Sequence, residues 1–157
     1  SSTDIGAGLP SSLINDVLVA GDGAIYVATT AGLAWSRDKG KSWRFSRGSD
    51  WLEKNKGRWK PAKVAPDAAQ ETLLLQDDVT CLAEDQRGFL WLGLRHQGYQ
   101  VLTRGAGQIV YYSALEPGGA KPDDYVSAIL PLPDSSPLVA RYGGEVGGVS
   151  VSARPFK

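Results

Sequence analysis

The feature that most constrains the fold of this chain is an internal repeat of short apolar segments. Residues 15–45 and residues 78–112 each carry four such segments, separated by short turns that contain glycine and polar residues. Short β-forming segments joined by such turns are typical of antiparallel hairpins. A single small sheet leaves apolar residues on both faces, so successive units must pack against one another. The repeat therefore favours stacked four-stranded sheets over long helices.

The positions of the strands follow from two clear copies and a weaker third. The first copy predicts strands over residues 17–20, 24–27, 33–35 and 42–45. The second copy predicts strands over residues 79–82, 89–92, 99–102 and 108–112. The third copy predicts strands over residues 125–130, 138–141 and 148–153, without a fourth strand. Between the first two copies, an early proline and early acids predict a short helix over residues 66–75.

These units predict an all-β chain built from the blades of a β-propeller. Propellers usually contain about four to eight blades. Three units, the last of them incomplete, therefore indicate part of a larger propeller or a ring closed by association with another copy. The expected order is a first blade, an inserted loop with a short helix, a second blade and an incomplete third blade, over residues 10–47, 48–76, 77–113 and 114–157.

Charge and cysteine content exclude several classes of function. Seventeen basic residues balance seventeen acidic ones, so the chain lacks the excess positive charge expected of a nucleic-acid-binding protein. Cys81 is the single cysteine, which rules out an internal disulfide and a multi-cysteine zinc site, and we expect neither a metal nor a cofactor. No apolar run reaches the ~18 residues of a membrane span. The chain has no methionine and no visible signal peptide, as expected of a processed or excised chain.

A compact motif lies in the turn between the third and fourth strands of the first copy. Ser36, Asp38, Gly40, Ser42 and Trp43 fill every fixed position of S-x-D-x-G-x-[ST]-W. In such a turn the aspartate accepts hydrogen bonds from backbone amides, the glycine adopts a positive φ and the tryptophan packs beneath the turn. The motif resembles the Asp-box of sialidase-like propellers, and this resemblance implies a structural role away from any active centre.

The repeat also resembles that of two-component regulator propellers, D-x-x-G-x-[LI]-W-[IVL]-G-T-x-x-G. The second copy matches at Asp85, Gly88, Leu90, Trp91, Leu92, Gly93 and Gly98, and departs from the pattern at Leu94. The first copy matches at Gly23, Ile25, Tyr26, Val27, Thr29 and Gly32, whereas Ala28 replaces a glycine. The third copy is degenerate. This resemblance implies a module of extracellular or periplasmic sensors, among which carbohydrate-responsive systems are frequent.

The expected binding surface is formed by the loops after each second strand and by the connections between units. It displays Thr29, Thr30, Arg95, His96, Arg141, Tyr142 and Glu145 at corresponding positions of the three copies. An arginine there can hold a carboxylate or a phosphate through its guanidinium fork. The alternative is a solvated polar rim without a ligand, because surface loops are polar by default.

Two tryptophans lie among lysines and arginines in the inserted loop. Exposed Trp51 and Trp59 can stack on a sugar or against a partner protein. The alternative is a loop folded over its own blade with both rings buried. A loop of this length is more often functional or disordered than incidental.

Three hypotheses for the function remain open. The first is a binding or sensory module whose ligand is a glycan or a partner protein. The second is part of a glycoside hydrolase or lyase, for which Asp78 and Asp124 are the candidate channel carboxylates. No other catalytic motif is present in a suitable context, and a binding module is favoured over an enzyme. The third is a structural ring of identical chains, because the edge of an incomplete blade invites a partner strand.

Overall fold

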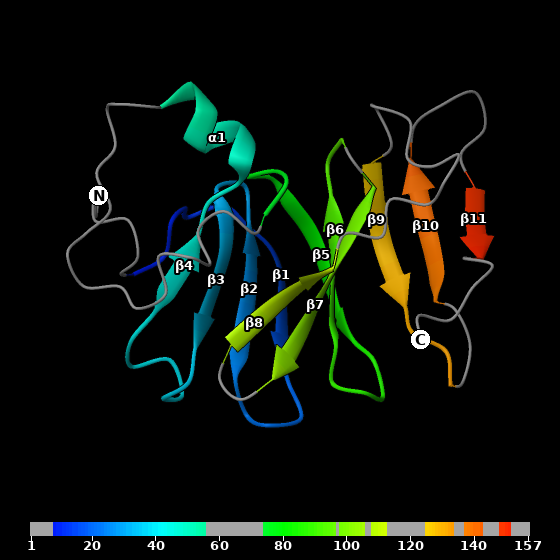
Figure 1. Cartoon of the computed structure of the whole chain (residues 1–157), viewed down its shortest axis with the longest axis horizontal. Coiled ribbons are helices and arrows are strands. Elements are labelled where there is room, and N and C mark those ends of the chain that lie inside the picture. Colours follow the sequence, from blue (N-terminus) through cyan, green and yellow to red (C-terminus); the bar gives the residue numbers. More distant parts are fainter. Residues whose placement is uncertain are drawn as a thin grey trace. The chain divides into compact units, whose positions relative to one another are not determined.

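A computed structural model describes residues 8–55, 74–96, 98–105, 108–112, 125–133, 137–142 and 148–151. Over these residues the chain forms antiparallel sheets and a short helix (Figure 1). Contacts divide the chain into two compact units, Ser1–Val79 and Thr80–Lys157.

The first unit contains a four-stranded sheet whose strands follow chain order. They are β1 (Ile14–Val19), β2 (Ile25–Thr29), β3 (Gly32–Ser36) and β4 (Arg44–Ser46). Directly opposite residues of antiparallel strands share a face, so Val27 and Ala34 lie side by side. Together with Phe45 they form the buried cluster of one face, whereas Tyr26 and Trp35 are buried on the other. Strands β2 and β3 are thus buried on both faces, as the strands of a propeller blade are, whereas β1 is largely exposed.

The second unit contains a four-stranded sheet and a three-stranded sheet. The first consists of β5 (Val79–Glu84), β6 (Leu90–Leu94), β7 (Tyr99–Gly105) and β8 (Gln108–Tyr112) in chain order. The other consists of β9 (Tyr125–Leu130), β10 (Leu138–Tyr142) and β11 (Gly148–Val151), with β10 in the middle. One hydrophobic cluster joins the two sheets, and its members are Cys81, Ala83, Trp91, Tyr99, Val101, Val126, Ile129 and Val139.

The two sheets of the second unit approach each other closely at Gly93 in β6. A Cβ atom at this position would lie 2.4 Å from Cys81 Sγ and 3.0 Å from Val126 Cγ1. The hydroxyl of Thr80 donates a hydrogen bond to the carbonyl of Val126. Strands β5, β6 and β9 therefore meet at a point where only glycine leaves enough room.

The strand predictions are confirmed, with small shifts at the ends. Strands β8 and β9 have the predicted bounds, and the others differ by a few residues. These strands, their chain-order pairing and the clusters between sheets make the chain all-β and built from propeller-type blades. The division of the chain into four segments stays a prediction.

The helix of the first unit lies outside the segment predicted for it. Residues 66–73 of the predicted helix fall outside the described part of the chain, whereas α1 (Ser49–Lys54) forms next to β4. Asp50 in the first turn and Lys54 in the last turn complement the helix dipole. Each is a weak local signal, which explains why the sequence pattern alone missed this helix.

Candidate functional site

The turn between β6 and β7 presents two of the predicted site residues. Gly98 closes this turn, since it adopts a φ of 76° and its carbonyl accepts a hydrogen bond of 2.8 Å from the amide of Leu94. Arg95 and His96 lie between these two residues, and both are exposed. The turn therefore presents a guanidinium and an imidazole to solvent at one end of the second unit.

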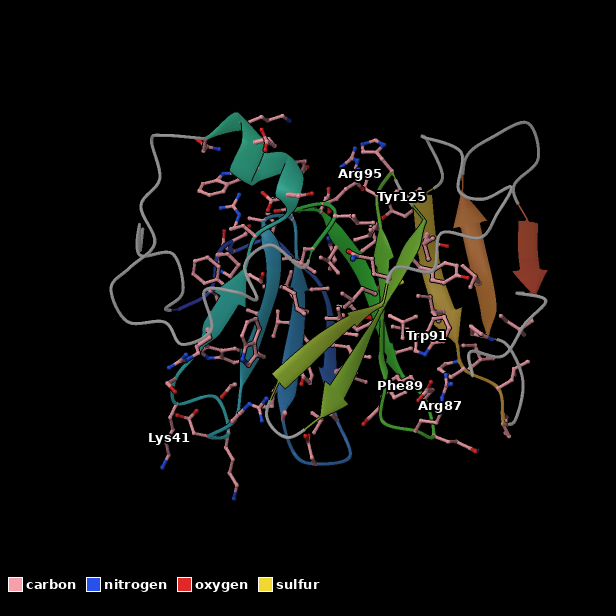
Figure 2. All side chains as sticks on the ribbon, viewed as in Figure 1. Lys41, Arg87, Phe89, Trp91, Arg95 and Tyr125 are labelled. Atoms are coloured by element: carbon pink, nitrogen blue, oxygen red, sulfur yellow. The ribbon has the colours of Figure 1, made fainter. Side chains whose placement is uncertain are left out.

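The start of β9 and the end of β10 lie at this same end of the second unit. Tyr125, half-buried, pairs with Tyr142, and Arg141 pairs with Val126. Val126 lies next to Gly93, so the start of β9 lies beside the end of β6. Figure 2 shows the side chains of Arg95 and Tyr125 at this end. We call Arg95, His96 and Tyr125 the β6–β9 end.

Backbone pairing therefore brings together four of the six predicted ligand-binding residues. The structure describes the backbone positions of Arg141 and Tyr142, and the side chains of Arg95 and His96. Glu145 lies outside the described residues. Sequence reasoning did not include Tyr125 in the site. The signal for it was present, because Tyr125 opens the first strand of the third copy and so lies at the same end as the loop after the second strand.

The corresponding turn of the first unit does not display both of its threonines. The prediction that Thr29 lines the surface is wrong, because Thr29 is buried. Its hydroxyl donates to the carbonyl of Gly32 at 2.8 Å and accepts from the amide of Ala31 at 3.0 Å. Thr30 is half-buried, and its hydroxyl forms a hydrogen bond of 3.0 Å with the hydroxyl of Ser11. The hydroxyl of Thr29 thus shapes the β2–β3 turn.

Trp51 lies in α1, where an arginine covers one side of its ring. The guanidinium carbon of Arg47 lies 4.2 Å from the ring centroid, and the tryptophan is half-buried. Arg47 also pairs with Asp77 through two hydrogen bonds, one of them 2.9 Å long from Nε. Trp59 lies outside the described residues. Stacking of either tryptophan on a sugar stays a prediction.

A wider hydrogen-bond network surrounds this ion pair. Asp77 accepts from the amide of Gly48 at 2.8 Å, and its own amide donates to Asp50 at 3.0 Å. The amide of Ser49 donates to the carbonyl of Leu74 at 2.7 Å. The network joins the residues after β4 to those before β5, and it therefore holds these two parts of the first unit together.

The turn between β3 and β4 has the hydrogen bonds expected from its sequence. Asp38 accepts from the amide of Ser42 at 2.8 Å and from its hydroxyl at 2.5 Å, and the hydroxyl of Ser36 donates to Asp38 at 2.8 Å. Gly40 adopts a φ of 84°, and Trp43 Nε1 donates to the carbonyl of Gly40 at 3.1 Å. Both carboxylate oxygens are thus occupied by the turn itself.

These hydrogen bonds predict a dependence of stability on pH. The hydrogen bonds from the side chain and amide of Ser42, followed by that from Ser36, lower the pKa of Asp38 from 3.8 to about 2. A carboxyl whose pKa is lower in the folded state stabilises the fold above its unfolded pKa, and this contribution is lost as pH falls through the folded pKa. We therefore expect the Tm difference between the unmodified protein and Asp38→Asn to be constant above pH 4 and to shrink between about pH 4 and pH 2.

Thermal unfolding followed by circular dichroism measures this difference. The Glu53→Gln variant controls for the loss of an exposed negative charge, because Glu53 lies at the surface of α1. A Tm difference that keeps its full size at pH 2 would contradict the assigned role of the Asp38 charge.

A second hydrogen-bonded turn lies at the other end of the second unit. Asp85 accepts hydrogen bonds from the amides of Arg87 and Phe89 and from Trp91 Nε1, at 2.9, 3.0 and 3.1 Å. Burial raises the pKa of Asp85, but hydrogen bonds from Arg87, Trp91 and Phe89, together with the charge of Arg87, lower it overall. Figure 2 shows Arg87, Phe89 and Trp91 together at this turn. These contacts explain why the repeat pattern contains this aspartate and this tryptophan.

The acidic residues that precede the first strands have structural partners where they are described. Asp77 holds Arg47, and Asp78 accepts a hydrogen bond of 3.2 Å from the side chain of Asn15. Asp124 lies outside the described residues, so the separation of Asp78 and Asp124 stays open. Within the described segments no group of His, Cys, Asp and Glu has the geometry of a metal site. No helix of the described part of the chain is long and apolar enough to cross a membrane.

Comparison with known proteins supports a β-propeller module. Residues 73–96 match the family model of the two-component regulator propeller, and this match spans β5, the Asp85 turn and β6. The crystal structure of virginiamycin B lyase from Staphylococcus aureus, in its selenomethionine form, is similar at a TM-score of 0.47 and 15% identity. The similarity covers 98% of this chain and 45% of that one, so the chain spans less than half the length of that protein. The search of curated proteins found no match.

Proposed function

We propose that this chain is the ligand-binding part of a sensory β-propeller and that it recognises an acidic glycan at the β6–β9 end. The observation that carries the proposal is the exposed pair Arg95 and His96 beside Tyr125. A guanidinium binds a carboxylate through two parallel hydrogen bonds, and the ring of a half-buried tyrosine offers an apolar face to a sugar.

The regulator-propeller repeat over residues 73–96 supports an extracellular or periplasmic location for this module. We also propose that the turn from Ser36 to Trp43 is an Asp-box, because its hydrogen bonds occupy the aspartate completely. In this proposal the Asp-box turn is structural, and binding belongs to the β6–β9 end.

The proposal predicts that Arg95→Ala weakens binding of an acidic oligosaccharide by about 10- to 100-fold, the range expected for a lost charge-assisted hydrogen bond. Isothermal titration with oligogalacturonate measures this change, and a neutral oligosaccharide of the same length tests the need for the carboxylate. Arg37→Ala is the matched control, because Arg37 is also exposed but lies in the β3–β4 turn. An equal loss in both variants would indicate nonspecific charge attraction and contradict the proposed site. Absence of binding to any acidic oligosaccharide would contradict the proposed ligand class.

A further inference from the structure

The β3–β4 turn of the first unit concentrates positive charge at its surface. Four basic residues lie within eight positions of the sequence, and all four are exposed: Arg37, Lys39, Lys41 and Arg44. The one acid among them, Asp38, uses both carboxylate oxygens in hydrogen bonds to Ser36 and Ser42. The chain as a whole carries no net charge, so this concentration is local. We call the four basic residues the basic tip.

Charge in the first unit is separated along the direction of its strands. The β1–β2 turn lies at the same end of the sheet as the basic tip and adds one acid, Asp22. Strand β4 leads from the tip to the opposite end, where α1 begins (Figure 1). That end carries four acids and two cations, which are Asp50, Glu53, Asp77, Asp78, Arg47 and Lys54. The first unit therefore has a positive end and a negative end, and a negatively charged surface attracts the former.

Lys39 occupies a backbone conformation that does not favour lysine. Its φ of 60° is the one positive φ among the described residues other than glycine, and Gly40 follows it with a φ of 84°. Glycine and asparagine adopt this left-handed conformation more readily than a residue with a long side chain. The backbone of the turn thus argues against a lysine at this position, and a role for its charge explains it.

The basic tip lies at an end of its sheet, and blades that neighbour one another in a propeller cover the faces of a sheet. Packing of further sheets against this one would therefore leave the tip exposed. Figure 2 shows Lys41 at the outer part of the turn. Because the tip is the turn of a hairpin, its cations reach a flat surface together more easily than they surround a small ligand.

We propose that the basic tip binds the surface of a membrane that contains anionic phospholipids. Clustered lysine and arginine side chains are attracted by the negative potential of such a surface, and four of them suffice for this kind of recognition. The separation of charge in the first unit turns the tip toward the membrane and α1 away from it. The inference does not depend on the proposed glycan, because the tip and the β6–β9 end share no residue.

Cosedimentation of the full chain with lipid vesicles tests this proposal. We expect binding to vesicles of equal parts phosphatidylcholine and phosphatidylserine, weakened by added salt, and no binding to vesicles of phosphatidylcholine alone. Lys39→Asn is expected to weaken binding by about fivefold, and the Lys39→Asn, Lys41→Ala double variant by about 20-fold. Asparagine tolerates the left-handed conformation, so Lys39→Asn should be at least as stable as the unmodified chain, which circular dichroism checks.

Lys54→Ala is the matched control, because it removes the same charge from the exposed surface of α1 and should bind vesicles like the unmodified chain. An equal loss in Lys54→Ala and Lys39→Asn would overturn the proposal, since it would assign binding to the overall charge. Absence of binding to anionic vesicles at low salt would also overturn it. A chain that binds heparin through the basic tip but does not bind these vesicles would identify the ligand as a soluble polyanion and contradict the membrane.

Discussion

The Gly93→Val variant is expected to lose about 3 kcal/mol of its free energy of unfolding, and Gly93→Ala about half as much. The reason is steric. A Cβ atom at residue 93 would lie 2.4 Å from Cys81 Sγ and 2.8 Å from Thr80 Oγ1, well inside van der Waals contact. The surrounding atoms belong to two strands, β5 and β9, so relief of the overlap requires one of these strands to move. A loss of this size is a large fraction of the stability of an ordinary domain.

Urea unfolding followed by circular dichroism measures this loss, and a second substitution identifies its cause. Cys81→Ala removes the sulfur atom nearest to the added carbon. We therefore expect the Gly93→Ala, Cys81→Ala double variant to be more stable than the sum of the two single effects predicts. Full stability of Gly93→Ala would show that β5 and β9 yield easily and would contradict the close packing. A double variant with strictly additive losses would place the strain elsewhere than at Cys81.

The first unit shows why this position differs between the copies. The carbonyls of Ala24 and Phe89 accept the hydrogen bonds that close the two equivalent turns. Ala28 and Gly93 each lie four residues after these positions, so they are equivalent. Ala28 is fully buried and tolerates a Cβ atom. The glycine of the repeat pattern is thus required by the neighbouring side chains of the second copy, and the backbone conformation of the strand does not itself demand it.

Local patterns predicted most of the strands because their determinants are local. Alternating apolar residues bounded by glycine and aspartate turns specify hairpins over a few residues, as at the Asp85 turn and the β3–β4 turn. Helix α1 has no comparable pattern. It is held by contacts to residues about 25 positions later, such as the hydrogen bond from the Ser49 hydroxyl to the carbonyl of Leu75. Contacts of this range leave no periodic signal in the sequence.

The candidate site was predictable only in part for the same reason. The repeat placed Arg95 and Arg141 at equivalent positions, and strand pairing brings their backbones to one end of the second unit. The position of Tyr125 near the β6–β7 turn depends on which sheets are neighbours, and the contact between Gly93 and Val126 shows that the sheet of β6 and the sheet of β9 are neighbours. The burial of Thr29 was missed because the sequence does not distinguish two kinds of threonine in a turn. One kind has a hydroxyl that bonds to the backbone of its own turn, as Thr29 does, and the other has a hydroxyl that faces solvent.

The Asp77→Ala variant is expected to lose about 2–3 kcal/mol of its free energy of unfolding. It removes both hydrogen bonds of Arg47 and the acceptor for the amide of Gly48. The guanidinium then stays in a largely buried position without its partner. Because the side chains of this pair are 15% exposed, solvent screens the remaining charge, and the loss falls below that of a fully buried pair.

Arg47→Lys distinguishes the geometry of this pair from its charge. A lysine keeps the positive charge but cannot form two parallel hydrogen bonds or stack flat on the ring of Trp51. We therefore expect Arg47→Lys to recover less than half of the stability lost in Arg47→Ala, and the fluorescence of Trp51 to change in both variants. Lys41→Ala is the control for loss of an exposed cation. If Arg47→Lys were as stable as the unmodified chain, simple charge attraction would be sufficient.

The hydrogen-bond network around Arg47 and Asp77 also bears on the inserted loop that follows α1. Arg47 and Asp77 are 30 positions apart, and Trp51 lies between them in the sequence. A chain segment whose ends are fixed together loses much of the conformational entropy that ligand binding would otherwise have to remove. If the loop contributes to glycan binding, Asp77→Ala should therefore weaken that binding at temperatures where the variant is still folded. Unchanged affinity in the folded variant would confine binding to the β6–β9 end and leave the Arg47–Asp77 pair with a purely structural role.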